Sequence, residues 1–128
     1  MILDTSAVVA VLREEDGFER LAAAMEGSDV LAIGAPTLFE TSMVLVGLHG
    51  DEGGRLVARF RDHWNVEVVP FDARHEHAAR DAFARYGKGR HPAKLNFGDC
   101  MSYATARLAE MPLLFIGDDF AKTDVEAA

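Results

Sequence analysis

The chain has 128 residues, a length typical of one domain and too short for two ordinary ones. Hydrophobic residues make up 49% of it, which is enough for a core and excludes a disordered chain; the single cysteine, Cys100, excludes an intrachain disulfide. The formal net charge of −8 argues against nucleic-acid binding by bulk attraction, because domains that bind in that way are usually basic overall.

Targeting and membrane signals are absent from the sequence. The N-terminal residues contain no basic segment followed by a long apolar run, so we expect no signal peptide. No stretch of about 18 consecutive apolar residues predicts a membrane span. We therefore expect one cytoplasmic domain over residues 1–128.

Short apolar runs alternate with helical stretches along the chain. The predicted strands are residues 1–3, 30–33, 66–69 and 113–116. The predicted helices are residues 5–13, 17–25, 36–48, 53–63, 73–86 and, after an Asn96 cap, 97 to about 110. Continuously apolar strands separated by such helices indicate an α/β fold with a parallel sheet covered on both faces.

Carboxylates follow the first and the last predicted strands. Asp4 comes directly after residues 1–3, and Asp118 and Asp119 come after residues 113–116. Each acid alone has an ordinary interpretation as a helix cap or a turn residue. Because ligands of parallel α/β sheets bind outside the carboxyl ends of the strands, the combination predicts that these acids converge on one site.

Two further acids lie near predicted helix starts. Glu40 is the only ionisable residue in the helix over residues 36–48, and its neighbours Met43 and Val44 predict a carboxylate among apolar groups, which needs a partner or a cation. Asp99 stands three residues after Asn96, as in a capping box, and an acid in a helix's first turn can also point into a cleft. The predicted site consists of Asp4, Glu40, Asp99 and Asp118, with Asp119 as the alternative fourth acid.

The predicted ligands are all oxygens. The five histidines show no pair at metal-binding spacing and Cys100 stands alone, which argues against zinc. Clustered carboxylates favour a hard cation, Mg²⁺ or Mn²⁺. Such a site can activate water and stabilise the leaving oxygen in phosphodiester cleavage. No glycine-rich nucleotide loop or nucleophile elbow appears, so no other cofactor is expected.

One dense basic segment, residues 88–94, lies just before the last predicted helix. Its cations, Lys88, Arg90 and Lys94, are candidates for contacts with the phosphate backbone of a nucleic acid. Tyr86 and Phe97 flank the segment, either to stack on bases or to pack in the core. An exposed loop that only balances nearby acids is the other interpretation of this segment.

Three segments resemble one known family. They are Met-Ile-Leu-Asp-Thr-Ser-Ala at residues 1–7, Tyr-Gly-Lys-Gly-Arg-His-Pro-Ala-Lys-Leu-Asn-Phe-Gly-Asp-Cys at residues 86–100, and Pro-Leu-Leu-Phe-Ile-Gly-Asp-Asp-Phe-Ala-Lys-Thr-Asp at residues 112–124. With them the chain resembles, from end to end, the PIN-domain toxins of the VapC type, the ribonuclease halves of bacterial toxin–antitoxin pairs.

The resemblance implies a three-layer α/β/α sandwich with a mainly parallel sheet, and cleavage of RNA, often structured RNA such as tRNA, with Mg²⁺ or Mn²⁺. It implies a homodimer and a VapB-type antitoxin that occupies the site. By position, Asp4 and Asp99 are the central metal ligands and Glu40 is the third acid. Many relatives place the fourth acid in a Thr-x-Asp or Thr-x-Asn turn, where this chain has Phe-Ile-Gly at residues 115–117; Asp118 is our choice, with Asp119 next. Thr5 or Ser6 would orient Asp4 or the water.

The acidic site suggests how a partner would bind. Carboxylates packed together without a metal repel one another, so our hypothesis is that an Arg or Lys of the antitoxin takes the place of Mg²⁺.

Two other functions fit parts of the pattern. A nuclease of the same fold that cuts DNA would keep the acidic site, although the chain has no room for an added duplex-clamping domain. A non-catalytic regulatory α/β module would also have an acidic pocket, but receiver domains pair adjacent acids after the first strand, where this chain has Asp4 alone.

Overall fold

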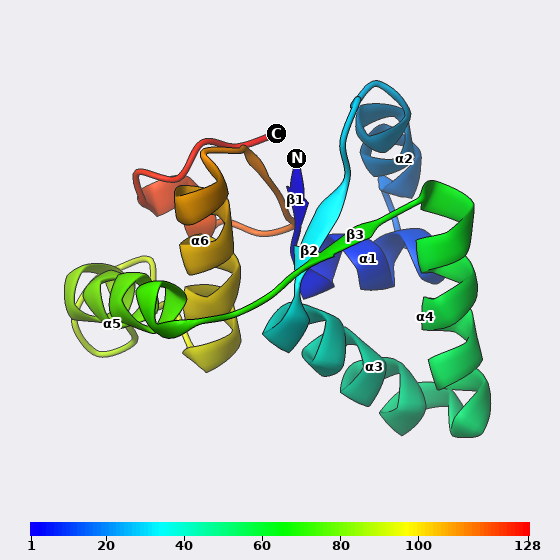
Figure 1. Ribbon diagram of the computed structural model, residues 1–128, viewed down its shortest axis with the longest axis horizontal. Helices are drawn as coiled ribbons and strands as arrows, with labels where there is room; N and C mark the ends of the chain where they lie inside the picture. Colours follow the sequence, from blue (N-terminus) through cyan, green and yellow to red (C-terminus); the bar gives the residue numbers. More distant parts are fainter.

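The computed structural model describes residues 1–128 and contains a four-stranded parallel sheet. Its strands are β1 (Ile2–Leu3), β2 (Ala32–Gly34), β3 (Glu67–Val69) and β4 (Leu113–Leu114), in the order β3-β2-β1-β4. Every pairing is parallel, and Ile2 stands opposite both Ala32 and Leu113. The expected parallel sheet is confirmed, and its strands point their carboxyl ends to one edge (Figure 1).

All six predicted helices are present, each within two residues of its expected ends. They are α1 (Thr5–Leu12), α2 (Phe18–Glu26), α3 (Ala35–His49), α4 (Asp51–Trp64), α5 (Ala73–Tyr86) and α6 (Phe97–Ala109). The predicted caps are also confirmed, because the Asp72 side chain accepts the N–H of Arg74 and the Asn96 side chain accepts the N–H of Asp99. A short 3₁₀ helix, η1 (Phe120–Lys122), was not predicted.

The helices cover both faces of the sheet and form two cores. Successive strand residues point to opposite faces, so Ile2 packs in a core with α5 and α6, whereas Leu3 packs in a core with α1, α2 and α4. Likewise, Leu113 packs in the core with α5 and α6, and Leu114 packs in the core with α1, α2 and α4. Figure 1 shows α5 and α6 on one side of the strands and α1, α2 and α4 on the other. The three-layer α/β/α sandwich is confirmed.

The outer strands depart from the prediction. β4 ends at Leu114 rather than at residue 116, because the chain turns towards η1, where Phe120 is buried against Phe115. β3 is an edge strand with a largely exposed surface, and Val68 is 36% exposed, so this strand is not covered on both faces as expected. None of the helices is long and apolar enough to cross a membrane.

Candidate functional site

Asp4 directly follows β1 and is the N-cap of α1. Its side chain is only 5% exposed, and both of its oxygens have protein partners. Oδ2 accepts hydrogen bonds from the backbone N–H of Ser6 at 2.9 Å and from Ser6 Oγ at 2.6 Å. Oδ1 accepts a hydrogen bond from Ser102 Oγ at 2.6 Å. The capping interpretation is therefore confirmed, and the carboxylate is held in one orientation at the strand end.

Glu40 lies in α3 and is half-buried. Its Oε1 accepts a hydrogen bond from Thr5 Oγ1 at 2.7 Å. The expectation that apolar side chains enclose Glu40 is wrong, because Met43 and Val44 are 58% and 38% exposed. These two neighbours of Glu40 face outward, and the carboxylate accepts its hydrogen bond from a hydroxyl of α1.

The helices α3 and α6 approach each other at Glu40 and Gly98. A β-carbon at position 98 would overlap the carboxylate of Glu40, so only glycine leaves room for this contact. Asp99 is the next residue along α6, which brings the two acids to the same place in the fold.

Asp99 occupies the first turn of α6 in a capping box. Its Oδ2 accepts the backbone N–H of Asn96 at 2.9 Å, and its own N–H donates to Asn96 Oδ1 at 2.9 Å. Burial raises the pKa of Asp99 to about 6, against the lowering effect of the Asn96 hydrogen bond. The negative charges of Asp4, Asp119 and Glu40 raise this pKa further. The acids therefore act on one another through space.

Asp4, Glu40 and Asp99 line one cleft with a volume of about 390 Å³. The remaining lining residues are Thr5, Ser6, Val9, Glu15, Val44, Asn96 and Ile116. The cleft lies where the end of β1 meets the starts of α1, α3 and α6, the edge of the sheet at which ligands of such folds bind. The three acids predicted from distant parts of the sequence are thus brought together.

The fourth predicted acid does not line this cleft. Asp118 is exposed and lies in the turn after β4, beyond Gly117, which has a φ of +104°. Asp119 is also exposed, but it is the neighbour whose negative charge raises the pKa of Asp99. Neither acid lines the cleft, and Asp119 acts on it through its charge on Asp99, so the choice of the fourth acid stays a prediction.

The donor set of the cleft fits a hard divalent cation in its chemistry. It offers carboxylate, hydroxyl and amide oxygens, and no His or Cys lines it. No three Asp, Glu, His or Cys side chains lie close enough to hold one ion by themselves. Mg²⁺ suits such a site, because it keeps several waters and is usually bound through one or two carboxylates together with substrate phosphates.

The basic loop lies directly before α6. Lys88, Arg90 and Lys94 are all exposed, and none of them forms an ion pair. The loop is closed by a bridge between Gly87 and Leu95. Its three cations therefore form no ion pair with acids of this chain, and the Arg90 guanidinium lies 5.6 Å from the centroid of the Phe83 ring. Contact of the loop with RNA phosphates stays a prediction.

The aromatic residues beside the loop differ in their surroundings. Phe97 is 79% exposed, so its ring does not pack in the core. Tyr86 is half-buried and packs at 6.0 Å, between ring centroids, against the buried Tyr103. The core interpretation therefore holds for Tyr86 and not for Phe97.

Hydroxyl groups behind the acids were not predicted. Ser102 bonds to Asp4, and its Oγ lies 3.1 Å from Thr37 Oγ1; both residues are buried. Their spacing in the sequence could have identified them. Ser102 follows Asp99 by three residues and Thr37 precedes Glu40 by three, so each hydroxyl lies on the same helix face as an acid.

Comparison with known sequences matches the chain to one family over nearly its whole length. The family model of the PIN domain matches residues 1–126. The chain is 48% identical over 127 residues to Ribonuclease VapC36 of Mycobacterium tuberculosis, covering 98% of this chain and 91% of that protein. It is 43% identical over 127 residues to Ribonuclease VapC of Mycolicibacterium smegmatis, covering 99% and 98% of the two chains.

Solved structures share the fold at low sequence identity. VapC20 of Mycobacterium tuberculosis, described as a sarcin–ricin loop cleaving toxin, superposes with a TM-score of 0.79 at 22% identity, over 99% of this chain and 97% of that one. VapBC2 of Rickettsia felis, bound to a DNA fragment of its promoter, gives a TM-score of 0.77 at 12% identity, over 99% and 96%. At these identities the likeness is one of fold.

Proposed function

This chain belongs to the PIN-domain family, with relatives named VapC ribonucleases over nearly its whole length, and from this premise we propose that it is an endoribonuclease toxin that cleaves RNA with Mg²⁺ or Mn²⁺. The observation that carries the proposal is the convergence of Asp4, Glu40 and Asp99 on one cleft. Acids from the end of β1, from α3 and from α6 meet there without a histidine or cysteine.

In this proposal Asp4 and Asp99 are the central ligands of the cation, and Glu40 is the third acid. The bound cation would activate a water molecule and stabilise the leaving oxygen. Ser6 holds Asp4, and Thr5 holds Glu40, through the hydrogen bonds described above. These fixed carboxylates are already desolvated and oriented, so little reorganisation is needed at the moment of reaction.

The RNA backbone would be held by the basic loop. The protein carries a net charge of −8, so attraction to phosphates must be local rather than general. Lys88, Arg90 and Lys94 supply that local charge directly before α6.

The proposed function is tested by incubating the purified protein, freed of any partner, with a structured RNA such as total tRNA. Cleavage into discrete fragments that requires Mg²⁺ or Mn²⁺ and stops in EDTA supports the proposal. Cleavage that continues in EDTA would contradict the role of a metal, and cutting of single-stranded DNA in place of RNA would support a DNA nuclease.

The two acids after β4 are expected to differ in importance. Asp119→Asn is expected to lower the cleavage rate by about tenfold or more, because it removes a carboxylate charge near Asp99 that would help to attract and hold the cation. Asp118→Asn is the matched control, since it makes the same change one residue away, and it should cleave at the wild-type rate. Single-turnover rates at saturating Mn²⁺ measure both, and a larger loss in Asp118→Asn would restore Asp118 as the fourth acid.

A VapB-type antitoxin is the proposed regulatory partner. One solved structure that shares the fold is a toxin–antitoxin complex from Klebsiella pneumoniae, with a TM-score of 0.72 at 18% identity, over 99% of this chain and 95% of that one. The negative charges that raise the pKa of Asp99 favour a cation in the cleft, so an Arg or Lys of the antitoxin would take the place of the metal there. A complex with no antitoxin cation near Asp4 and Asp99 would contradict this.

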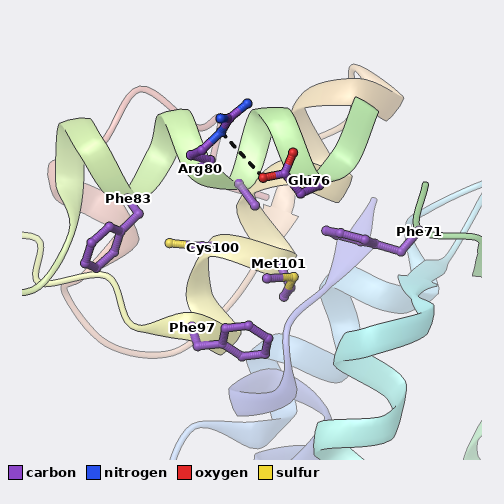
Figure 2. Close-up of a pocket in the computed structure, with 8 residues that line it drawn as sticks. Phe71, Glu76, Arg80, Phe83, Phe97, Cys100 and Met101 are labelled. Carbon is purple, nitrogen blue, oxygen red and sulfur yellow. Dashed lines mark ion pairs between the residues drawn. The ribbon is translucent and has the colours of Figure 1, made fainter. Parts of the chain in front are cut away.

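A homodimer is the proposed assembly, and exposed apolar surface supports it. On α3, Phe39, Met43 and Val46 are 67%, 58% and 44% exposed. Between α5 and α6 an apolar pocket of about 410 Å³ is lined by aromatic side chains including Phe83 and Phe97 (Figure 2). The helices α3 and α6 meet at Glu40 and Gly98. The exposed apolar side chains of α3 and the apolar pocket between α5 and α6 therefore lie on either side of this contact. Apolar surface of this extent is typical of an interface, and a second copy would cover it in a symmetric dimer.

The dimer proposal predicts that charge on α3 dissociates the protein. Met43→Glu combined with Val46→Glu is expected to convert a dimer into a monomer in sedimentation velocity, because two desolvated carboxylates at the interface are costly. Val30→Glu is the matched control, since Val30 is 42% exposed but lies outside α3. A wild-type monomer, or dissociation by Val30→Glu alone, would contradict the proposed interface.

A further inference from the structure

Two buried hydroxyl groups form a hydrogen-bonded chain that ends at Asp4. Ser102 on α6 and Thr37 on α3 are 0% and 1% exposed. Ser102 Oγ lies 2.6 Å from Asp4 Oδ1 and 3.1 Å from Thr37 Oγ1. Neither residue lines the cleft, so neither is available to touch a substrate.

The direction of these hydrogen bonds follows from counting hydrogens. An ionised carboxylate only accepts, so the single hydrogen of Ser102 Oγ is donated to Asp4. The contact between the two hydroxyls then requires Thr37 Oγ1 to donate to Ser102 Oγ. The chain from Thr37 through Ser102 to Asp4 therefore has one arrangement, and it runs from α3 across α6 to the end of β1.

A second hydroxyl on α6 shows what a purely structural role looks like. Thr105 is 0% exposed, and its Oγ1 donates to the carbonyl of Met101, four residues back in the same helix. This is the ordinary bond of a buried helical threonine. Ser102 instead donates to a carboxylate 98 positions away in the sequence. The difference indicates that the Ser102 hydroxyl serves Asp4 rather than its own helix.

We propose that Ser102, oriented by Thr37, is a positioning residue that fixes the Asp4 carboxylate for binding of the divalent cation. The inference rests on the proposed function, in which Asp4 is a central ligand. Asp4 Oδ2 already accepts two hydrogen bonds from Ser6, whereas Ser102 is the only protein donor to Oδ1. Without it, the carboxylate is held through one oxygen and can rotate. Groups that orient a metal ligand typically change metal affinity by about 10-fold to 100-fold when they are removed.

The test measures binding of Mn²⁺ alone, without RNA, by electron paramagnetic resonance of the free ion. Ser102→Ala is expected to raise the dissociation constant by about 10-fold or more. Thr37→Val keeps the shape of the side chain and removes the donor to Ser102. It is expected to raise the dissociation constant for Mn²⁺ by a smaller factor. Thr105→Val is the matched control, a buried Thr-to-Val change on α6 that does not touch an acid, and its dissociation constant should equal that of the wild type.

The outcomes separate this inference from the proposed function. If wild-type protein cleaves RNA with Mn²⁺ and Ser102→Ala binds Mn²⁺ as tightly as the wild type, the role of Ser102 is overturned while the ribonuclease stands. If Thr105→Val weakens Mn²⁺ binding as much as Ser102→Ala does, the loss is a general effect of packing, and the positioning role of Ser102 is also overturned. Should Ser102→Ala fail to fold, Thr37→Val decides, because wild-type Mn²⁺ affinity in that variant contradicts the proposed chain. A wild-type protein that binds no Mn²⁺ would overturn the inference directly.

Discussion

Replacing Asp99 with Asn is expected to reduce the rate of RNA cleavage by at least a factor of about 10² to 10³. The change removes one of the two proposed central carboxylates and leaves the shape of the side chain intact. Asn still offers an oxygen to the N–H of Asn96, so the capping box at the start of α6 is retained. Single-turnover rates with excess enzyme and saturating Mn²⁺ measure the loss, and circular dichroism checks the fold.

Metal-free stability gives a second readout of the same variant, with a sign fixed by the pKa of Asp99. This pKa is raised from 3.8 to about 6, so the folded protein holds the proton more tightly than the unfolded chain does. The free energy of unfolding therefore falls as the pH rises from about 4 to about 6, and stays low above that. Because the group is partly exposed, the effect is no more than about 1 to 2 kcal/mol.

Asp99→Asn does not have the cost of ionising Asp99 in the folded protein. It should therefore be more stable than the wild type at pH 7.5 in EDTA, and no more stable than the wild type at pH 4. Comparing the two proteins at each pH removes the contribution of the five histidines, which both contain. Added Mn²⁺ should stabilise the wild type and not the variant. Cleavage at the wild-type rate by Asp99→Asn would remove Asp99 from the mechanism, and a stability difference of the opposite sign would contradict its raised pKa.

Neutralising the basic loop is expected to weaken RNA binding and to flatten its salt dependence. Changing Lys88, Arg90 and Lys94 together to Gln removes three cations that form no ion pair in the protein. For single-stranded RNA the slope of log affinity against log salt should fall by about two, because each lost phosphate contact contributes about 0.7. Binding to Asp99→Asn in Ca²⁺, which avoids cleavage, measures this slope by fluorescence anisotropy.

A control with the same loss of charge separates local from general attraction. Arg20, Arg55 and Arg59 are exposed and lie outside the loop, so their combined change to Gln alters the net charge equally. We expect a slope close to that of the unaltered protein. Equal flattening by both triple variants would mean that the loop has no special role in holding RNA.

The main part of the fold followed from local signals. The helix starts at Asp72 and Asn96 were predictable because each cap makes its hydrogen bonds within three residues. Parallel strands were predictable from their apolar runs, and with them the position of Asp4 at a strand end. The end of β4 was not predictable, because it depends on packing of Phe120 against Phe115 through η1.

The site was predictable in part for the same reason. Asp4, Glu40 and Asp99 were found because strand ends and helix starts of a parallel sheet meet at one edge. The positions of the Asp118 and Asp119 carboxylates relative to the cleft depend on the turn at Gly117, whose backbone conformation the sequence alone does not determine. The bond from Ser102 to Asp4 joins residues 98 positions apart, and the apolar side chains beside Glu40 face outward, which local periodicity does not reveal.

Cleavage of cellular RNA by the acidic cleft can be measured with Asp99→Asn as the control. Wild-type protein and Asp99→Asn, purified identically and freed of any partner, are incubated with total cellular RNA with and without Mn²⁺, and the new ends are mapped. We expect discrete ends that appear only with the wild type and only with metal. Ends produced equally by both proteins, or none with the wild type in Mn²⁺, would contradict it.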